Sequence, residues 1–253
     1  MKQKISTGII GLGMLALVSG TAQAEIGPGA SQIASPSAFA GASFGSPIAF
    51  GSDWGDVGVG VFGQTLHKDS ASRGDADAGI VFGLGNADKY VGLETAVNIA
   101  TLTHLNGERF GDNGSLGFKL HTNLPGNSAF AVGVVATGRW GNAKNQNTAS
   151  TYAVGTKVFS ISNHALVANL GIGDEGFQEP GHTGANVFGS LAYYVTRQIS
   201  VIVDDSGRFV NAGISLAPIR SIPATVTIGA TNLGNRHGLH TQFAAAIGYG
   251  FHF

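Results

Sequence analysis

The chain has 253 residues, a formal net charge of −1 and only 11% charged residues, well below the roughly 25% that is typical of soluble domains. This balance provides no basic face for nucleic acid, so we expect no nucleic-acid partner. The sequence contains no cysteine, which excludes disulfide bonds and leaves stability to packing and backbone pairing.

The first 24 residues have the layout of a secretory signal peptide. Lys2 and Lys4 give a positive start, residues 8–18 are apolar, and Ala22-Gln23-Ala24 matches an A-x-A cleavage pattern. The apolar run is shorter than the roughly 20 residues that a spanning helix needs. We therefore expect residues 1–24 to be a signal peptide and the remaining chain, with 12 basic and 15 acidic residues, to be exported.

Residues 25–54 form a second segment, rich in Gly, Ser and Ala and weak in periodicity. Such a composition indicates a linker or a loosely ordered segment. It is also compatible with a plug tucked inside a barrel, and the sequence leaves these alternatives open. Gly41 to Gly45 matches G-x-S-x-G, but a nucleophile elbow needs a strand, a turn and a helix, and no helical pattern follows here.

Residues 55–253 show the pattern of an all-β domain. Twelve short segments alternate with period two and are separated by turn residues. Short and longer connections follow one another in turn, as in outer-membrane barrels. The pattern predicts an antiparallel transmembrane β-barrel, with these strands: Asp56–Thr65, Ala76–Leu84, Lys89–Leu102, Ser115–Thr122, Ala129–Trp140, Thr151–Ser160, Ala165–Gly173, Ala185–Val195, Ile199–Asp204, Phe209–Ala217, Ala224–Thr231 and His240–Phe253.

Each predicted strand has one apolar face and one face of small or polar residues. In residues 151–160, for example, Tyr152, Val154 and Val158 alternate with Gly155 and Lys157. A soluble sandwich would turn the apolar face inward, whereas a membrane barrel turns it toward lipid. Because the polar faces carry few charges, we expect the apolar faces to point outward.

Five charged residues fall on the faces that we expect to line the lumen: Asp77, Glu94, Lys119, Arg139 and Lys157. Charges inside a barrel either pair to fill a closed core or line a water-filled passage. Pairing of Glu94 with Lys119 across neighbouring strands would serve the first role. The sequence does not decide between the two.

The last strand ends on aromatic residues. Ile247, Tyr249, Phe251 and Phe253 form one apolar face that runs to the final position. This resembles the C-terminal strand of bacterial outer-membrane β-barrel proteins, a porin-like class. The blocks DKYVGLETAVNIATL and FGDNGSLGFKLHTNLPGN are similar to those of an uncharacterised set of exported barrels. The resemblance implies an outer-membrane location, contact with the lipid bilayer, and reading of these four residues by the barrel-assembly machinery.

These observations favour a passive role. We expect a channel for small solutes, selected by pore width and interior charges. The alternative is a closed structural or surface barrel that binds a partner through its outer loops. We expect no enzyme, cofactor or metal site, because no convincing nucleophile–base pair and no spaced histidine motif is present.

Overall fold

The computed structural model describes residues 39–65, 74–100, 102, 109–141, 143–146, 148–179, 182–236 and 240–253. The expected signal peptide lies outside these residues. The barrel starts at Asp56, and the described residues before it belong to the Gly/Ser/Ala-rich segment.

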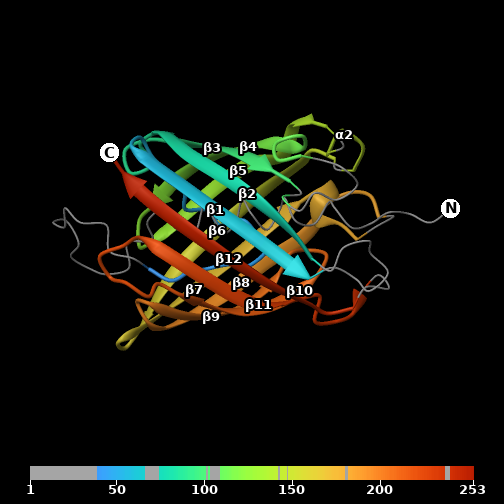
Figure 1. Cartoon of the computed structure of the whole chain (residues 1–253). Helices are drawn as coiled ribbons and strands as arrows, with labels where there is room; N and C mark the ends of the chain where they lie inside the picture. The colour runs from blue at the N-terminus through green and yellow to red at the C-terminus, as the bar shows by residue number, and fades with distance from the viewer. Residues whose placement is uncertain are drawn as a thin grey trace.

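Twelve antiparallel strands form one closed barrel, as the sequence predicts (Figure 1). Each strand pairs with the next in the chain, and β1 pairs with β12 to close the ring. Closure leaves no unpaired sheet edge, which is the condition for strands to cross a membrane. The strands are β1 (Asp56–Thr65), β2 (Gly74–Gly85), β3 (Gly92–Ile99), β4 (Gly114–Leu124), β5 (Ser128–Trp140), β6 (Ser150–Ile161), β7 (His164–Gly173), β8 (Asn186–Thr196), β9 (Ile199–Asp205), β10 (Val210–Leu216), β11 (Ala224–Thr231) and β12 (Gln242–His252).

The two ends of the barrel differ. One end, called here the short-turn end, carries the start of β1, the end of β12 and the connections 86–91, 125–127, 162–163, 197–198 and 217–223. The other, called the long-loop end, carries mostly longer connections, among them those that contain helix α2 (Ala143–Gln146) and the 3₁₀ helix η2 (Glu175–Phe177). This asymmetry is typical of outer-membrane barrels.

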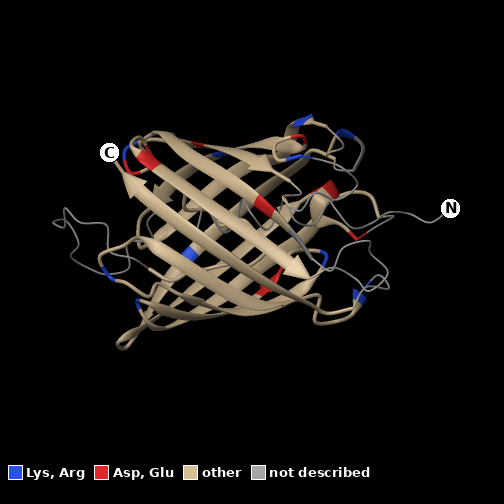
Figure 2. Ribbon diagram, in the orientation of Figure 1, with Lys and Arg blue, Asp and Glu red and all other residues tan. Residues whose placement is uncertain are grey.

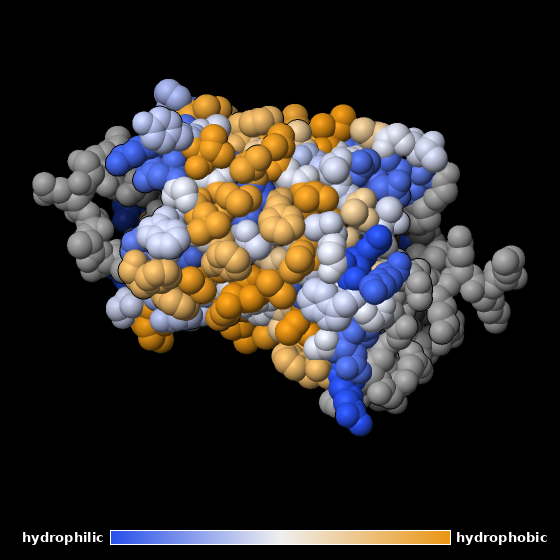
Figure 3. All heavy atoms as spheres, turned by 90° about the horizontal axis from the view of Figure 1, so that it is seen from above, coloured by the Kyte–Doolittle hydropathy of each residue, from blue (hydrophilic) through white to orange (hydrophobic). Residues whose placement is uncertain are grey.

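The barrel is apolar outside and largely polar or small inside. In β9, Ile199, Val201 and Val203 are exposed, whereas Ser200 and Asp204 are buried. The four residues of the C-terminal apolar face lie on β12 or, for the last of them, directly after it, and all are exposed: Ile247, Tyr249, Phe251 and Phe253. Apolar residues cover the waist of the molecule and polar residues gather toward its ends (Figure 3). This distribution is that of a membrane-spanning barrel.

Charged residues are few on the strands and more frequent at the two ends (Figure 2). Among the described residues, no helix is long and apolar enough to cross a membrane.

The face prediction for β6 was wrong. Tyr152, Val154 and Val158 are buried inside the barrel, and Lys157 consequently lies on the outer side, where its ammonium donates to the carbonyl of Gly126 at the short-turn end. The reason is that the lumen is filled at this strand, where Tyr152 packs against the rings of Phe177 and Phe188 inside the barrel. Lys157 can extend its charged end to the membrane boundary, as long cationic side chains do.

Two irregularities interrupt the pairing of β4 with β5. Ala136 and Gly138 both have positive φ, of 54° and 49°, and such bulges reset which side chains face inward. A strict alternation from Gly133 to Arg139 therefore does not hold. Arg139 is partly buried near the long-loop end, and the Trp140 ring covers Gly114 of β4.

We predict that a charge in the middle of the outer face destabilises the barrel in lipid. Ile228, in the middle of β11, is 52% exposed. Ile228→Arg should lower the free energy of unfolding by about 2–4 kcal/mol, because the guanidinium would sit near the bilayer midplane. Urea unfolding of vesicle-inserted protein, followed by tryptophan fluorescence, measures this. The control Ile161→Arg, at the end of β6, should cost about 0–1 kcal/mol; equal losses would contradict the outward orientation.

Candidate functional site: a plug inside the barrel

Residues 40–53, called here the plug segment, lie within the barrel. Their side chains are almost all buried, although they precede the first strand. The Ala40 N–H donates to the carbonyl of Arg197 in the β8–β9 turn, at the short-turn end. The segment reaches the level of Asp204, near the long-loop end of β9. It then returns to Asp53, which accepts hydrogen bonds from the Ala87 N–H in the β2–β3 turn. The plug segment is thus a re-entrant loop.

Hydroxyl groups of β8, β9 and β10 hold the first residues of the plug segment. The Gly41 N–H donates to Ser215 Oγ at 2.7 Å, and Ser200 Oγ donates to the Gly41 carbonyl at 2.6 Å. Ser200 and Ser215 are directly opposite each other on paired strands. Tyr194 donates its hydroxyl to the Ala40 carbonyl at 2.8 Å. A buried peptide unit thereby finds the partners that it would lose with water.

Asp204 anchors the innermost turn of the plug segment. Its Oδ2 accepts the Ser46 N–H at 2.9 Å and the Ser46 hydroxyl at 2.6 Å, and lies 2.9 Å from Ser43 Oγ. Asn211 donates to Oδ1 at 3.0 Å. A buried carboxylate needs such donors because burial of an unpaired charge is costly. Phe44 lies beside Phe62 of β1, with ring centroids 6.3 Å apart.

Neutral side chains of β6 and β7 hold the returning arm. Asn169 donates to the Pro47 carbonyl, and the Ala49 N–H donates to Thr156 Oγ1 at 2.8 Å. Thr156 in turn donates to Asn169 Oδ1 at 2.7 Å. The two barrel residues are therefore held by each other as well as by the plug segment.

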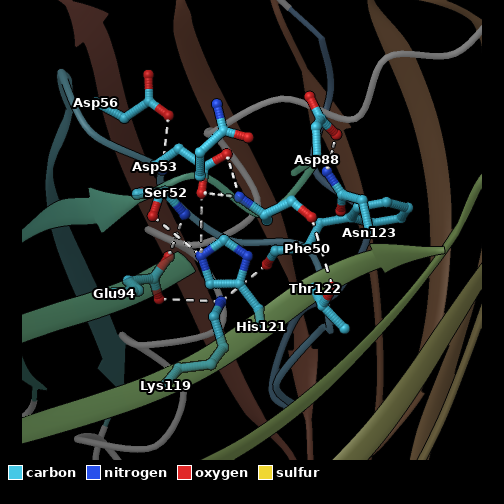
Figure 4. Close-up of polar contacts among 12 residues, drawn as sticks. Phe50, Ser52, Asp53, Asp56, Asp88, Glu94, Lys119, His121, Thr122 and Asn123 are labelled. Carbon is cyan, nitrogen blue, oxygen red and sulfur yellow. Dashed lines mark hydrogen bonds and ion pairs between the residues drawn. The ribbon is translucent and has the colours of Figure 1, made fainter. Parts of the chain in front are cut away.

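A buried ion pair completes the returning arm (Figure 4). Lys119 Nζ lies 3.0 Å from Glu94 Oε1, and both side chains are 1% exposed. Lys119 also donates to the Phe50 carbonyl at 2.8 Å, and Glu94 Oε2 accepts the Ser52 N–H at 3.0 Å. His121 Nε2 lies 3.0 Å from the Ser52 carbonyl. The pair therefore bonds to the plug segment as well as to itself, which offsets the desolvation of two charges.

Acidic residues end the plug segment at the short-turn end. Asp53 lies 3.8 Å from His121 Nε2 and accepts the Ala87 N–H. Burial raises the pKa of the Asp53 carboxyl, and the Ala87 hydrogen bond opposes this by lowering it. Asp56, which accepts the Asp53 N–H, also contacts His252 at 2.8 Å. The last strand and the plug segment thus meet at this acidic pair.

A loop of the long-loop end also folds inward. Phe177 of η2 is fully buried and stacks on Phe188 of β8, with centroids 4.6 Å apart and planes 23° apart. Tyr152 lies next to both rings, with centroids 5.7 and 6.2 Å away. Arg208 donates to the carbonyls of Gln178 and Glu175, which fixes this loop to the β9–β10 connection. The aromatic cluster fills part of the barrel at the end opposite the short turns.

The structure separates the five charged residues expected in the lumen. Asp77, Glu94 and Lys119 are buried in the interior, and Glu94 pairs with Lys119 across adjacent strands. Arg139 lies beyond the β5 irregularities and is only partly buried. Lys157 lies on the outer side and is not part of the interior set. The ion pair packs against the plug segment rather than bordering an open passage.

Among the residues that bind the plug segment, the sequence pattern singles out only the ion pair. Asp204, His121, Ser200 and Ser215 sit on inward positions of strands, but single polar residues in alternating strands carry no signature. The signal that the sequence did offer was the Gly/Ser/Ala composition of the segment. The structure gives a reason for its glycines, since Cβ atoms at Gly41, Gly45 and Gly51 would come within 2.6–3.1 Å of barrel side chains.

The described residues contain no group of three or more His, Cys, Asp or Glu side chains that could hold a metal ion. The Ser43 hydroxyl of the G-x-S-x-G match is bonded to Ser46 and Asp204. This Ser–Asp contact belongs to the plug anchor.

The sequence matches no model of a known protein family, and no curated protein is significantly similar to it. Among solved structures, an outer-membrane channel from Pseudomonas putida F1 is similar, with a TM-score of 0.47 and 10% identity. The alignment covers 90% of this chain and all of that one. The fold assignment therefore rests on the strand pairing and side-chain burial of this chain.

We predict that the buried ion pair is costly to break and cheap to replace. Lys119→Met removes the cation that lies 3.0 Å from the buried Glu94 carboxylate, and should destabilise the protein by about 3–5 kcal/mol. The double variant Lys119→Met/Glu94→Leu should be more stable than Lys119→Met, because no charge is then stranded. Urea unfolding in vesicles measures both. Additive losses in the double variant would show that the two charges do not act as a pair.

Proposed function

We propose that this protein is an outer-membrane channel for small solutes that its own plug segment closes at rest. The observation that carries the proposal is the re-entrant course of residues 40–53 through the barrel, bonded mainly by hydrogen bonds to polar side chains of the wall. On this proposal, solutes pass through the barrel when the plug segment leaves the lumen.

The polar wall behind the plug segment supports this proposal. Its inward residues include many that would hydrate once exposed: Asp77, Glu94, Asn98, Lys119, His121, Asn169, Ser190, Ser200, Asp204 and Asn211. A barrel of about 8 strands is filled by its own side chains and one of 16–18 strands leaves an open channel. Twelve strands lie between these limits, which suits a lumen wide enough for a re-entrant peptide loop and, without it, for small solutes.

The setting follows from the same features. We infer that the apolar band faces the lipid bilayer of a bacterial outer membrane and that the short-turn end faces the periplasm. Ile247, Tyr249, Phe251 and Phe253, all exposed on β12 or directly after it, are the residues that we propose the barrel-assembly machinery reads.

We predict that weakening the plug anchor opens the channel. Asp204→Ala removes the acceptor for the Ser46 N–H and hydroxyl, so the plug segment should leave the lumen more often. The open probability in a planar bilayer should rise at least about tenfold, because the loss of one strong hydrogen bond changes the equilibrium by about that factor. Asp205→Ala is the matched control, because the neighbouring carboxylate bonds to Gly207 and not to the plug segment.

A disulfide lock provides the second arm of this experiment. An added Cβ at Gly41 would lie 3.5 Å from Ser215 Cβ, within the range for a disulfide, and the chain has no other cysteine. Gly41→Cys/Ser215→Cys in the Asp204→Ala background should be silent when oxidised and conduct after reduction. Folded Asp204→Ala barrels that carry no current would reject the channel and favour a closed surface barrel that binds a partner through its long loops.

A further inference from the structure

We propose that the barrel interior is a binding site for a polypeptide loop, which accepts a segment of another chain rich in Gly, Ala and Ser when the plug segment has left. The proposal deepens the proposed function and rests on it in one respect, namely that the plug segment can leave. The observations concern how the wall contacts residues 40–52.

At two residues of the plug segment, side chains of the wall bond to both the main-chain N–H and the main-chain carbonyl. At Gly41, the N–H donates to Ser215 of β10 and the carbonyl accepts from Ser200 of β9. At Ser52, the N–H donates to Glu94 of β3 and the carbonyl contacts His121 of β4. Each clamp uses two adjacent strands. An N–H donor and a carbonyl acceptor on one residue are the pattern that a peptide backbone presents.

Further main-chain contacts lie between the two clamps. Wall side chains bond to the carbonyl of Ala42, the N–H of Ser46, the carbonyl of Pro47, the N–H of Ala49 and the carbonyl of Phe50. The partners come from β4 and β6 to β9. Because these contacts read groups that every residue shares, the site tolerates changes of side chain, as in other main-chain recognition modes.

Space sets most of the specificity, and Asp204 adds to it by accepting the hydroxyls of Ser43 and Ser46. A Cβ at Gly45 would come within 2.8 Å of Asn211 Nδ2, and a Cβ at Gly51 within 2.6 Å of His121 Cδ2. Contacts under 3.0 Å force a neighbour to move, and these side-chain ends are held in place, Asn211 by its hydrogen bond to Asp204 and His121 by its contact with the Ser52 carbonyl. The interior therefore selects a chain with glycine at these two places and small residues around them, and the occasional ring, such as Phe44 beside Phe62, fills the wider parts.

The test uses the full chain with its own plug segment displaced. Gly45→Val and Gly51→Val together should expel the segment by steric conflict. The probe is a fluorescently labelled synthetic peptide of residues 39–53, FAGASFGSPIAFGSD, and its anisotropy reports binding to the detergent-solubilised barrel. The control barrel is oxidised Gly41→Cys/Ser215→Cys, whose lumen stays occupied, so any signal there measures micelle partition alone.

We expect the peptide to bind the Gly45→Val/Gly51→Val barrel and not the oxidised control. A peptide carrying the two valines should bind at least about tenfold more weakly, and so should the native peptide when the barrel also carries Lys119→Met/Glu94→Leu, which removes the Phe50 and Ser52 contacts. Replacing the alanines at positions 40, 42 and 49 of the peptide by serine should leave its affinity for the barrel within about threefold of the native value, because the wall bonds to the main chain there.

A folded barrel that fails to bind the peptide overturns the proposal, as does equal binding of the native and valine peptides. If the double-valine chain does not fold, the single variant Gly45→Val, which leaves every wall residue intact, takes its place with the same expected order of affinities. Anisotropy is independent of current. Binding without conductance would reject the proposed channel and keep the peptide site, whereas conductance without binding would do the reverse.

Discussion

The structure depends on one constraint, which is that peptide groups inside a barrel have to find hydrogen-bond partners away from water. The strands meet it through their ladders. The plug segment has no ladder, and the wall supplies side chains instead: paired serines for Gly41, a carboxylate for Ser46, and a lysine with its glutamate for Phe50 and Ser52. This need explains why an ion pair, an aspartate and a histidine are buried in a protein that is only 11% charged.

The barrel was predictable because its periodicity is a direct consequence of burial. In β12, each outward residue from Phe243 to Phe251 is apolar and each inward one is small or polar, and in β9 the buried Ile202 is the one exception to this rule. The prediction failed where a local environment departed from this rule. In β6, Tyr152 packs against Phe177 of an inward-folded loop, and an apolar residue that fills the lumen cannot be told by sequence pattern from one that faces lipid. The bulge at Ala136 and Gly138 of β5 likewise leaves no residue signature beyond one glycine.

The candidate site was predictable only in part. Glu94 and Lys119 stand out because charges on alternating strands are rare, and cross-strand neighbours of opposite sign are expected to pair. The plug segment was one of several alternatives for a Gly/Ser/Ala-rich stretch, since composition gives flexibility and small size but no location. Its position depends on contacts with residues 34 to 174 positions away, which no local pattern encodes.

The re-entrant course has a mechanical consequence. The segment enters and leaves at the same end of the barrel, with its innermost turn at Asp204. Tension applied at Phe39 toward the short-turn end would load the contacts one after another, beginning with the Ala40 and Gly41 bonds, then the aspartate, and finally the lysine. Bonds that are peeled in sequence yield at low force, whereas the same bonds sheared together resist strongly. A plug that is stable at equilibrium can thus be withdrawn by a weak pull in one direction, while pressure on its innermost turn from the opposite mouth would load many contacts at once.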